Sequence, residues 1–202
     1  MDTVVFTIGH STHEWDFFLA LLRQAGVTAV ADVRSSPYSA FSPQYSSAEL
    51  QAALRLAGIS YVFMGKELGG RPIDPRCYSD GIADYEKMAI SATFRDGIER
   101  VIEGSRKHRI ALMCSERDPL DCHRFLLVSR RLAERYFSPA HILADGEVST
   151  HHEIEDRLLE LTRRMADDLF APRAERLALA YRERARKVAY SEALNKSGAD
   201  FR

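Results

Sequence analysis

The chain has 202 residues, of which 46% are hydrophobic and 28% are charged, and its formal net charge is −1. This is an ordinary composition for a globular protein, and the length suits a single full hydrophobic core. A net charge so close to zero argues against a protein-wide attraction to nucleic acid or membrane, although local basic patches are still possible.

The sequence shows no membrane-spanning or export segment. No apolar stretch is long enough to cross a bilayer, and polar residues interrupt every apolar run near the N-terminus, namely Asp2, His10, His13 and Glu14. The three cysteines, Cys77, Cys114 and Cys122, are an odd number in a chain without an export signal. We therefore expect reduced thiols and a cytoplasmic location.

Strands and helices alternate in the first part of the chain. Short β-branched and apolar runs predict buried strands, and apolar residues at helical spacing predict amphipathic helices. In chain order we expect a strand over residues 4–8, a helix over 15–25, a strand over 28–33, a helix over 47–57 and a strand over 59–63.

Two long loops interrupt this alternation. The first, residues 35–46, holds the aromatic residues Tyr38, Phe41 and Tyr45, which either stack on a base or simply anchor the loop. The second, residues 64–81, contains two glycines followed by Arg71. That pattern is typical either of a lid that brings an arginine over a site or of a plain surface turn.

The second half of the chain continues the alternation and then becomes helical. We expect a helix over residues 82–103 with a break near Ser91, a strand over 109–113, a helix from 125 to about 136 and a strand over 140–143. Farther along, Ile154, Leu158, Leu161, Met165 and Leu169 mark one amphipathic helix. A second, arginine-rich helix is expected over residues 173–193, and its charges suit a solvated face.

These elements predict an α/β fold. The expected architecture is a mostly parallel sheet of about five strands with helices on both faces. Residues 1–148 would form this α/β domain, and residues 149–202 would form a helical C-terminal extension packed on it. The sequence contains no internal repeats and no low-complexity tracts.

Polar residues stand where four of the predicted strands end. They are His10 and Ser11, Asp32 and Arg34, Cys114 and Glu116, and Asp145. The carboxyl ends of parallel strands share one edge of a sheet, so residues far apart in sequence meet there. We therefore expect His10, Asp32, Arg34, Cys114, Glu116 and Arg124 to line one pocket, roughly 10 Å across.

The segment ALMCSERDPLDCHR, residues 111–124, concentrates reactive side chains at a single strand-loop-helix corner. Asp121 is expected to cap the helix that follows, by accepting from the backbone of His123 or Arg124. Free N–H groups at such a helix start attract anions and lower the pKa of a thiol. The structural alternative is a pair of buried cysteines with a salt-bridged arginine.

A metal site at this corner is the weaker hypothesis. Zinc could use Cys114, Cys122 and His123, with His10 as a fourth ligand. However, neighbouring ligands at a helix start are expected to point in different directions, and no Cys-x-x-Cys pair occurs. The sequence therefore predicts no metal and no cofactor.

Five motifs resemble the domain-of-unknown-function 488 (DUF488) family. They are GHS at 9–11, DVRSSPYSAFSPQYS at 32–46, LGG at 68–70, CSERDPLDCHR at 114–124 and HILADG at 141–146. The resemblance implies a single α/β domain and marks the motif positions as a site. Ala40 departs from the family pattern, which usually has arginine there, so an anion contact at this position would be weakened or relocated.

The leading functional prediction is an enzyme, a hydrolase or transferase, acting on a phosphate-bearing or other anionic substrate related to nucleotides or nucleic acids. The expected catalytic residues are Cys122 or Cys114 as the nucleophile, and His10, Glu116 or His123 as the group that moves a proton. The expected substrate-binding residues are Ser11, Asp32, Arg34, Arg71, Arg117 and Arg124.

Two alternatives remain open at this level. The arginine-rich helix and the aromatic loop favour a binding module for a nucleotide or nucleic acid that performs no reaction. The ligand types at the corner favour a metal-dependent hydrolase. No membrane partner is expected, and the sequence does not indicate an oligomeric state.

Overall fold

The structure is a computed structural model that describes residues 4–39, 41–135, 137–166 and 171–192. Four residues on which sequence predictions fall lie outside this part of the chain: Ala40, Tyr136, Leu169 and Ala193. Within the described part, no helix has both the length and the apolar character that a bilayer crossing requires.

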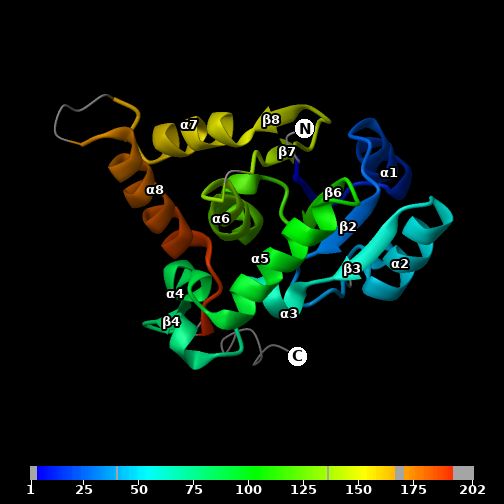
Figure 1. The fold of residues 1–202 in the computed structure, drawn as a ribbon, viewed down its shortest axis with the longest axis horizontal. Coiled ribbons are helices and arrows are strands. Elements are labelled where there is room, and N and C mark those ends of the chain that lie inside the picture. The colour runs from blue at the N-terminus through cyan, green and yellow to red at the C-terminus, as the bar shows by residue number, and fades with distance from the viewer. Residues whose placement is uncertain (1–3, 40, 136, 167–170, 193–202) are drawn as a thin grey trace.

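A six-stranded sheet forms the centre of the fold, with the strand order β3-β2-β6-β1-β7-β8 (Figure 1). The strands are β1 (Phe6–Gly9), β2 (Ala29–Asp32), β3 (Ser60–Phe63), β6 (Ile110–Cys114), β7 (Ala140–Ile142) and β8 (Val148–Thr150). All neighbouring pairs are parallel except β7 and β8, which are antiparallel. The predicted α/β class and mostly parallel sheet are confirmed.

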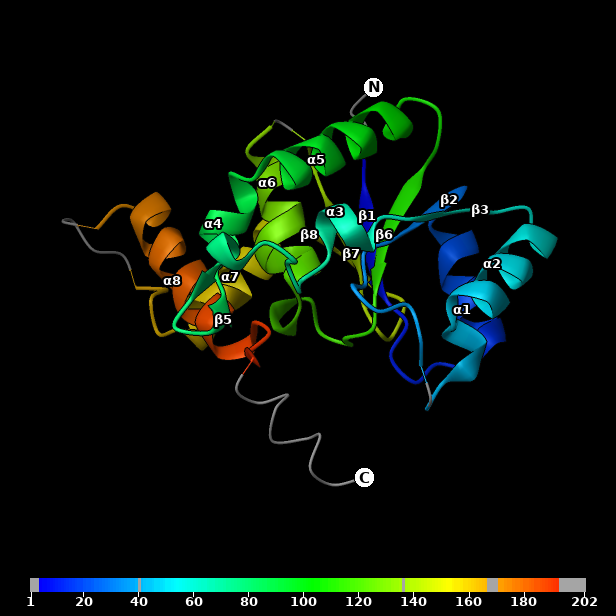
Figure 2. The same ribbon diagram turned by 90° about the horizontal axis from the view of Figure 1, so that it is seen from below.

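Helices cover both faces of this sheet, as expected (Figure 2). They are α1 (Trp15–Gln24), α2 (Ser47–Leu56), α3 (Gly65–Leu68), α4 (Tyr85–Ala89), α5 (Ala92–Ser105), α6 (Arg130–Ala133), α7 (His151–Leu161) and α8 (Arg173–Val188). The shorter turns are η1 (Pro43–Tyr45), η2 (Pro75–Cys77), η3 (Pro119–Asp121) and the π-helical η4 (Arg124–Ser129).

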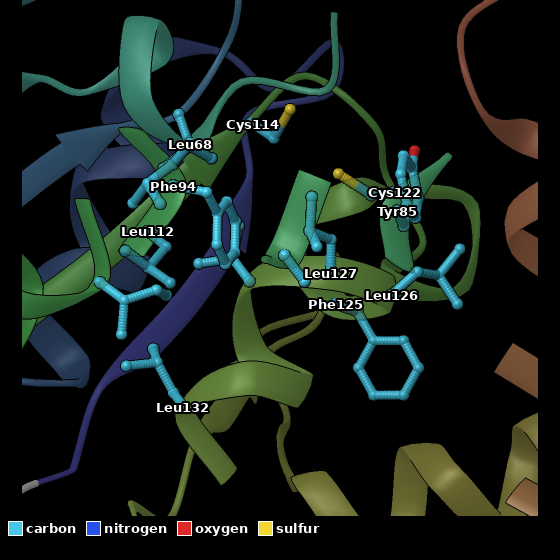
Figure 3. Packing of buried hydrophobic residues seen from close by; sticks show 14 of the residues in the cluster. Leu68, Tyr85, Phe94, Leu112, Cys114, Cys122, Phe125, Leu126, Leu127 and Leu132 are labelled. Carbon is cyan, nitrogen blue, oxygen red and sulfur yellow. The ribbon is translucent and has the colours of Figure 1, made fainter. Parts of the chain in front are cut away.

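Alternate residues of strand β6 enter two different cores. Ala111 and Met113 pack on the side of α1 and α2, whereas Leu112 and Cys114 pack on the side of α5 and η4. This division follows from the two-residue period of a strand. Cys114 and Cys122 therefore belong to the same cluster of buried side chains as Leu112 (Figure 3).

The predicted helix over residues 82–103 is wrong at its start. Tyr78–Ser79 and Ile82–Ala83 form the short antiparallel strands β4 and β5 instead. Asp84 then caps α4 by accepting from the backbone N–H groups of Glu86 and Lys87. The break near Ser91 is confirmed, because Ser91 caps α5 by accepting from the N–H of Phe94.

The C-terminal helices pack beside the corner that follows β6. Helix α7 begins at a capping box formed by Thr150 and Glu153 and ends at Leu161, so Met165 falls outside it. Helix α8 contacts α7 and η4, and its Tyr181 ring stacks on Phe125 at a centroid distance of 5.4 Å. The segment after α8 then pairs with β5, where the N–H of Ala83 donates to the carbonyl of Tyr190.

Candidate functional site

Three neighbouring strands bring their exits to one edge of the sheet. Strand β6 lies between β2 and β1, and the backbone N–H of His10 donates to the carbonyl of Cys114 at 2.9 Å. On the other side, the N–H of Val33 donates to the carbonyl of Met113 at 3.0 Å. His10 and Cys114 therefore lie at the same edge, as the parallel sheet predicts.

Four side chains converge just beyond the end of β6. One ligand-type atom from each of Cys114, Glu116, Cys122 and His123 lies within 4.8 Å of the others. The thiol of Cys122 donates to Oε2 of Glu116 at 2.9 Å, and both sulfur atoms lie 3.8 Å from Nδ1 of His123. We call these four residues the Cys/His/Glu cluster.

The expectation that Cys122 and His123 point in different directions is wrong. Cys122 precedes the helix in an extended conformation, because η3 ends there, and the helical turn that follows is π-helical. Nε2 of His123 lies 3.0 Å from the carbonyl oxygen of Val33, an arrangement in which Nε2–H donates. Nδ1 is then the ring nitrogen that faces the two sulfur atoms.

Close backbone approaches hold this corner against its neighbours. A Cβ at Gly70 would lie 3.0 Å from Cγ of His123, and a Cβ at Gly9 would lie only 1.9 Å from the carbonyl oxygen of Glu116. Gly9 therefore requires glycine, whereas a Cβ at Gly70 would press on the imidazole and force it to shift by a few tenths of an ångström.

A small polar crevice opens beside the cluster. It has a volume of about 180 Å³, and the predicted site residues Arg34, Arg71, Cys114, Glu116 and His123 line it. Cys122 is 1% exposed and contributes nothing to the crevice wall as described. A ligand in the crevice would therefore meet the thiol of Cys114 before that of Cys122.

Arg34 and Asp32 form a buried pair rather than an open anion site. Nε and Nη2 of Arg34 donate to the two carboxylate oxygens of Asp32 at 2.9 and 2.7 Å, and Nη2 also donates to the carbonyl of Tyr45. Nη1 of Arg34 lies 3.2 Å from Nε2 of His10, whose ring stacks on Tyr45. This pairing leaves Arg34 little capacity for a ligand, and His10 and Asp32 lie outside the crevice wall.

The guanidinium of Arg124 is also engaged in hydrogen bonds within the protein. Its side chain is fully buried, and its guanidinium donates to the backbone carbonyls of Glu116 at 2.7 Å and Arg117 at 3.1 Å. The side chain of Arg117 is exposed, and neither it nor Ser11 belongs to the crevice wall. The geometry therefore brings only part of the predicted arginine set to the crevice.

Arg71 is the exception among these arginines. Its backbone N–H donates to Oγ of Ser35 at 2.9 Å, and its guanidinium carbon lies 4.9 Å from the centre of the Tyr190 ring. Within the described part of the chain, no carboxylate lies within ion-pair distance of this guanidinium. Arg71 is thus the cation most available to a ligand at the crevice.

A family model described as "Domain of unknown function DUF488" matches residues 14–131, which is more than half of the chain. The chain belongs to the DUF488 family. The match contains the motifs at 32–46, 68–70 and 114–124, whereas those at 9–11 and 141–146 lie outside it. Neither the curated proteins nor the solved structures gave a match to the chain.

In this DUF488 protein, the protonation of the cluster is shaped by burial and by its own close contacts. Burial raises the pKa of Cys114 well above its ordinary value, so this thiol stays protonated. Burial also acts to raise the pKa of Glu116, but the charge of His123 and the two thiols lower it to about 2. Burial opposes ionisation of Cys122 as well, but the nearby Cys114 and the charge of Arg124 lower its pKa overall.

The predicted helix cap at Asp121 is wrong. The helical segment that begins at Arg124 has His123 at its N-cap position and no side-chain cap. Asp121 ends the short turn η3 and pairs with Arg184 of α8. Asp118 caps η3 itself, because its Oδ1 accepts from the N–H of Leu120 at 2.8 Å, and Pro119 starts that turn in the position where proline is tolerated.

The features that favoured nucleic-acid binding have other partners in the DUF488 chain. Along α8, Arg173, Arg184, Arg186 and Lys187 form ion pairs with Asp156, Asp121, Asp80 and Glu183 respectively. In the aromatic loop, Tyr45 is fully buried, and its hydroxyl donates to the carbonyl of His13. Tyr38 and Phe41 are exposed but do not line the crevice.

Several residues of the crevice wall were not predicted. Ser35 and Ser36 directly follow Arg34, so their position at a strand exit was a usable signal. Tyr85 begins α4, just after the short strand β5, in a stretch that the sequence pattern predicted to be one continuous helix. Val188 and Tyr190 come from the far end of the chain, and no local pattern indicates that they return to this edge.

Proposed function

We propose that this DUF488 protein is an enzyme, of the hydrolase class, that acts on a small substrate bearing a phosphate or other anionic group. One observation carries the proposal: the guanidinium of Arg71, which has no carboxylate partner among the described residues, and the Cys/His/Glu cluster share one small crevice. A cation that holds an anion beside groups able to move protons is the arrangement that such a reaction needs.

The size of the crevice restricts the substrate. Its volume of about 180 Å³ is below the roughly 300–1,000 Å³ of typical small-molecule sites. A single charged group and its nearest atoms would fill it. The rest of a larger substrate, such as a nucleotide, would extend into solvent over Tyr190.

The protonation states favour water over a thiol as the attacking group. Cys114 reaches the crevice, but burial keeps its thiol protonated, and Cys122 does not reach the wall. Glu116 faces the crevice as a carboxylate and would orient a water molecule there. Arg71 would hold the anionic group in place for attack.

Direct binding measurements test the anion site. Calorimetric titration of the purified protein with inorganic phosphate, pyrophosphate and small phosphate monoesters should show binding to at least one of them. Arg71→Ala should weaken this binding at least about tenfold without lowering the melting temperature, because the side chain is exposed. Arg76→Ala, on the same loop and paired with Asp74, is the matched control and should bind normally.

Absence of binding by the wild-type protein at millimolar concentrations of all these ligands would contradict the proposal. So would equal losses of affinity in Arg71→Ala and Arg76→Ala. A panel of phosphate esters then tests turnover, with hydrolysis of at least one ester as the expected result.

We also propose that residues 149–202 form an extension that completes the site on the α/β domain of residues 1–148. Val188 and Tyr190 line the crevice, and Tyr190 lies against Arg71. Free thiols at Cys77, Cys114 and Cys122 support a reducing compartment, so we propose a cytoplasmic location.

A further inference from the structure

The Cys/His/Glu cluster has the geometry of a metal centre. A tetrahedral zinc ion, with Zn–S bonds of about 2.3 Å and Zn–N bonds of about 2.0–2.1 Å, places its ligand atoms roughly 3.3–3.8 Å apart. The two sulfur-to-Nδ1 distances of 3.8 Å fall at this value. All four candidate atoms lie within 4.8 Å of one another, and the 2.9 Å between the sulfur of Cys122 and Oε2 of Glu116 would have to lengthen by about 0.5 Å for tetrahedral coordination.

The ligand types select the metal. Two thiols and an imidazole are soft and borderline donors, which suit zinc and exclude magnesium and calcium as preferred ions. The carboxylate of Glu116 is a common fourth ligand for zinc. From these observations we propose that Cys114, Cys122, His123 and Glu116 bind a zinc ion, with Glu116 as the ligand nearest the crevice.

The surroundings orient these ligands as the outer contacts of a metal site do. The hydrogen bond of His123 Nε2–H to the carbonyl of Val33 leaves Nδ1 as the free donor atom, directed into the cluster. The backbone N–H of Arg124 lies 3.4 Å from the sulfur of Cys122 and donates to it. Both interactions fix ligand atoms without occupying the space between them.

The short contact between Cys122 and Glu116 is a place where a cation can replace a proton. A sulfur and a carboxylate oxygen lie 2.9 Å apart between Cys122 and Glu116, a distance that needs a proton or a cation to hold them together. The buried guanidinium of Arg124 is engaged with two backbone carbonyls. A divalent ion would displace the thiol protons of Cys114 and Cys122 and bind both sulfur atoms and the carboxylate at once.

Exposure separates the four ligands into two groups. Cys114, Cys122 and His123 are 2%, 1% and 7% exposed, whereas Glu116 is half-buried at the crevice. With Glu116 bound, the zinc has four protein ligands and no open position; displacement of Glu116 at the open side would give the three protein ligands and the exchangeable fourth position of a catalytic zinc site. That exchangeable position would hold the water molecule for hydrolysis. This role in hydrolysis rests on the proposed function, whereas the metal site itself does not.

Metal analysis tests the site directly. Protein purified without a metal-affinity column should contain about one zinc per chain by mass spectrometry. Cys114→Ser and Cys122→Ser should each lose most of this zinc, and Cys77→Ser, which changes the buried cysteine outside the cluster, should keep it. Glu116→Gln should keep zinc but release it faster to a chelator.

A cobalt titration keeps the test valid if the cysteine variants do not fold. Wild-type protein stripped of metal under reducing conditions should bind one equivalent of Co(II), with the strong absorption of thiolate-bound tetrahedral cobalt, and zinc should displace it. Protein that contains no zinc and shows no such absorption would overturn the proposal, as would a Cys114–Cys122 disulfide in the freshly purified protein. Loss of phosphate binding in Arg71→Ala with full zinc content would separate the anion site from the metal site.

Discussion

Two buried polar clusters centred on histidine differ in how their hydrogen bonds are arranged. The Cys/His/Glu cluster converges on one region of space and opens to a crevice. The second cluster joins Thr7 of β1, His141 of β7, His151 and Glu155 of α7, and Tyr181 of α8 in a linear chain. Both clusters are attached to the same sheet, so the main difference between them is how their hydrogen bonds are arranged.

In the linear chain every contact has one consistent direction. Tyr181 donates to Glu155, so it accepts from Nε2–H of His151, and Nδ1 of His151 accepts from His141. Nδ1 of His141 then accepts from the hydroxyl of Thr7 at 2.8 Å. Each donor has one acceptor, both histidines are neutral, and no atom is left for a ligand.

The difference separates a structural role from a functional one. The linear chain connects the C-terminal helices to the sheet through satisfied hydrogen bonds, which is how buried polar groups are normally stabilised. The Cys/His/Glu cluster instead brings sulfur, nitrogen and carboxylate oxygen atoms together at one point. These atoms can each make more interactions than they make with one another. Convergence, rather than the presence of histidine, therefore distinguishes the cluster for which we propose a function.

The largest expected effect comes from removing the support of the converging cluster. Arg124→Ala would deprive the carbonyls of Glu116 and Arg117 of their buried donor, and we expect unfolding free energy to fall by about 3–5 kcal/mol. Urea unfolding measures this loss. Arg109→Ala is the control, because its exposed side chain donates to the carbonyl of Ala25; it should lose less than about 1 kcal/mol. Similar losses in both variants would contradict the supporting role of Arg124.

The second-largest effect is expected on acidification, which should lower the stability that the linear chain contributes. Burial lowers the pKa of His151 to about 4, whereas an unfolded chain has the ordinary value of 6.5. As pH falls below 6.5 the unfolded state binds the proton first, so stability present above 6.5 is lost towards pH 4. The loss at His151 alone is on the order of 3 kcal/mol.

Urea unfolding from pH 7 to pH 4.5, with wild type and His151→Gln side by side, isolates this contribution. The variant should be less stable at pH 7 but should show a smaller loss on acidification. Parallel pH profiles for the two proteins would show that His151 takes up its proton equally in the folded and unfolded states. That result would contradict a lowered pKa of His151 in the folded protein.

A smaller effect is expected at the outer end of the linear chain. Tyr181→Phe keeps the ring that stacks on Phe125 but removes the acceptor of His151 and the donor to Glu155. We expect a loss of about 1–3 kcal/mol in unfolding free energy, with zinc content and phosphate affinity unchanged. A changed zinc content would mean that the two clusters are coupled. That result would contradict separate roles for the linear chain and the Cys/His/Glu cluster.

Sequence patterns predicted the strands that carry the site, because apolar runs such as residues 110–113 have a clear physical signature. Strands β4, β5 and β8 were missed because they have only two or three residues, and in β8 these residues are largely exposed. The predicted residues Cys114, Glu116, Cys122 and His123 do lie together, because a strand exit collects polar groups; their role as a site stays a prediction.

The geometry within the corner was beyond the sequence. Helical geometry suggested that Cys122 and His123 diverge, and neither the extended backbone at Cys122 nor the π-helical turn after it has a local signal. Likewise, a sequence does not show which arginines are already occupied. Arg34 and Arg124 looked as available as Arg71, and only tertiary contacts distinguish them.

X-ray absorption at the zinc edge of the purified protein tests the central claim, that the converging cluster is the functional centre, most directly. The account predicts two sulfur neighbours at about 2.3 Å and two nitrogen or oxygen neighbours at about 2.0–2.2 Å. Addition of phosphate should change the oxygen shell in wild type but not in Arg71→Ala. A zinc ion without sulfur neighbours, or protein without any metal at this edge, would contradict it.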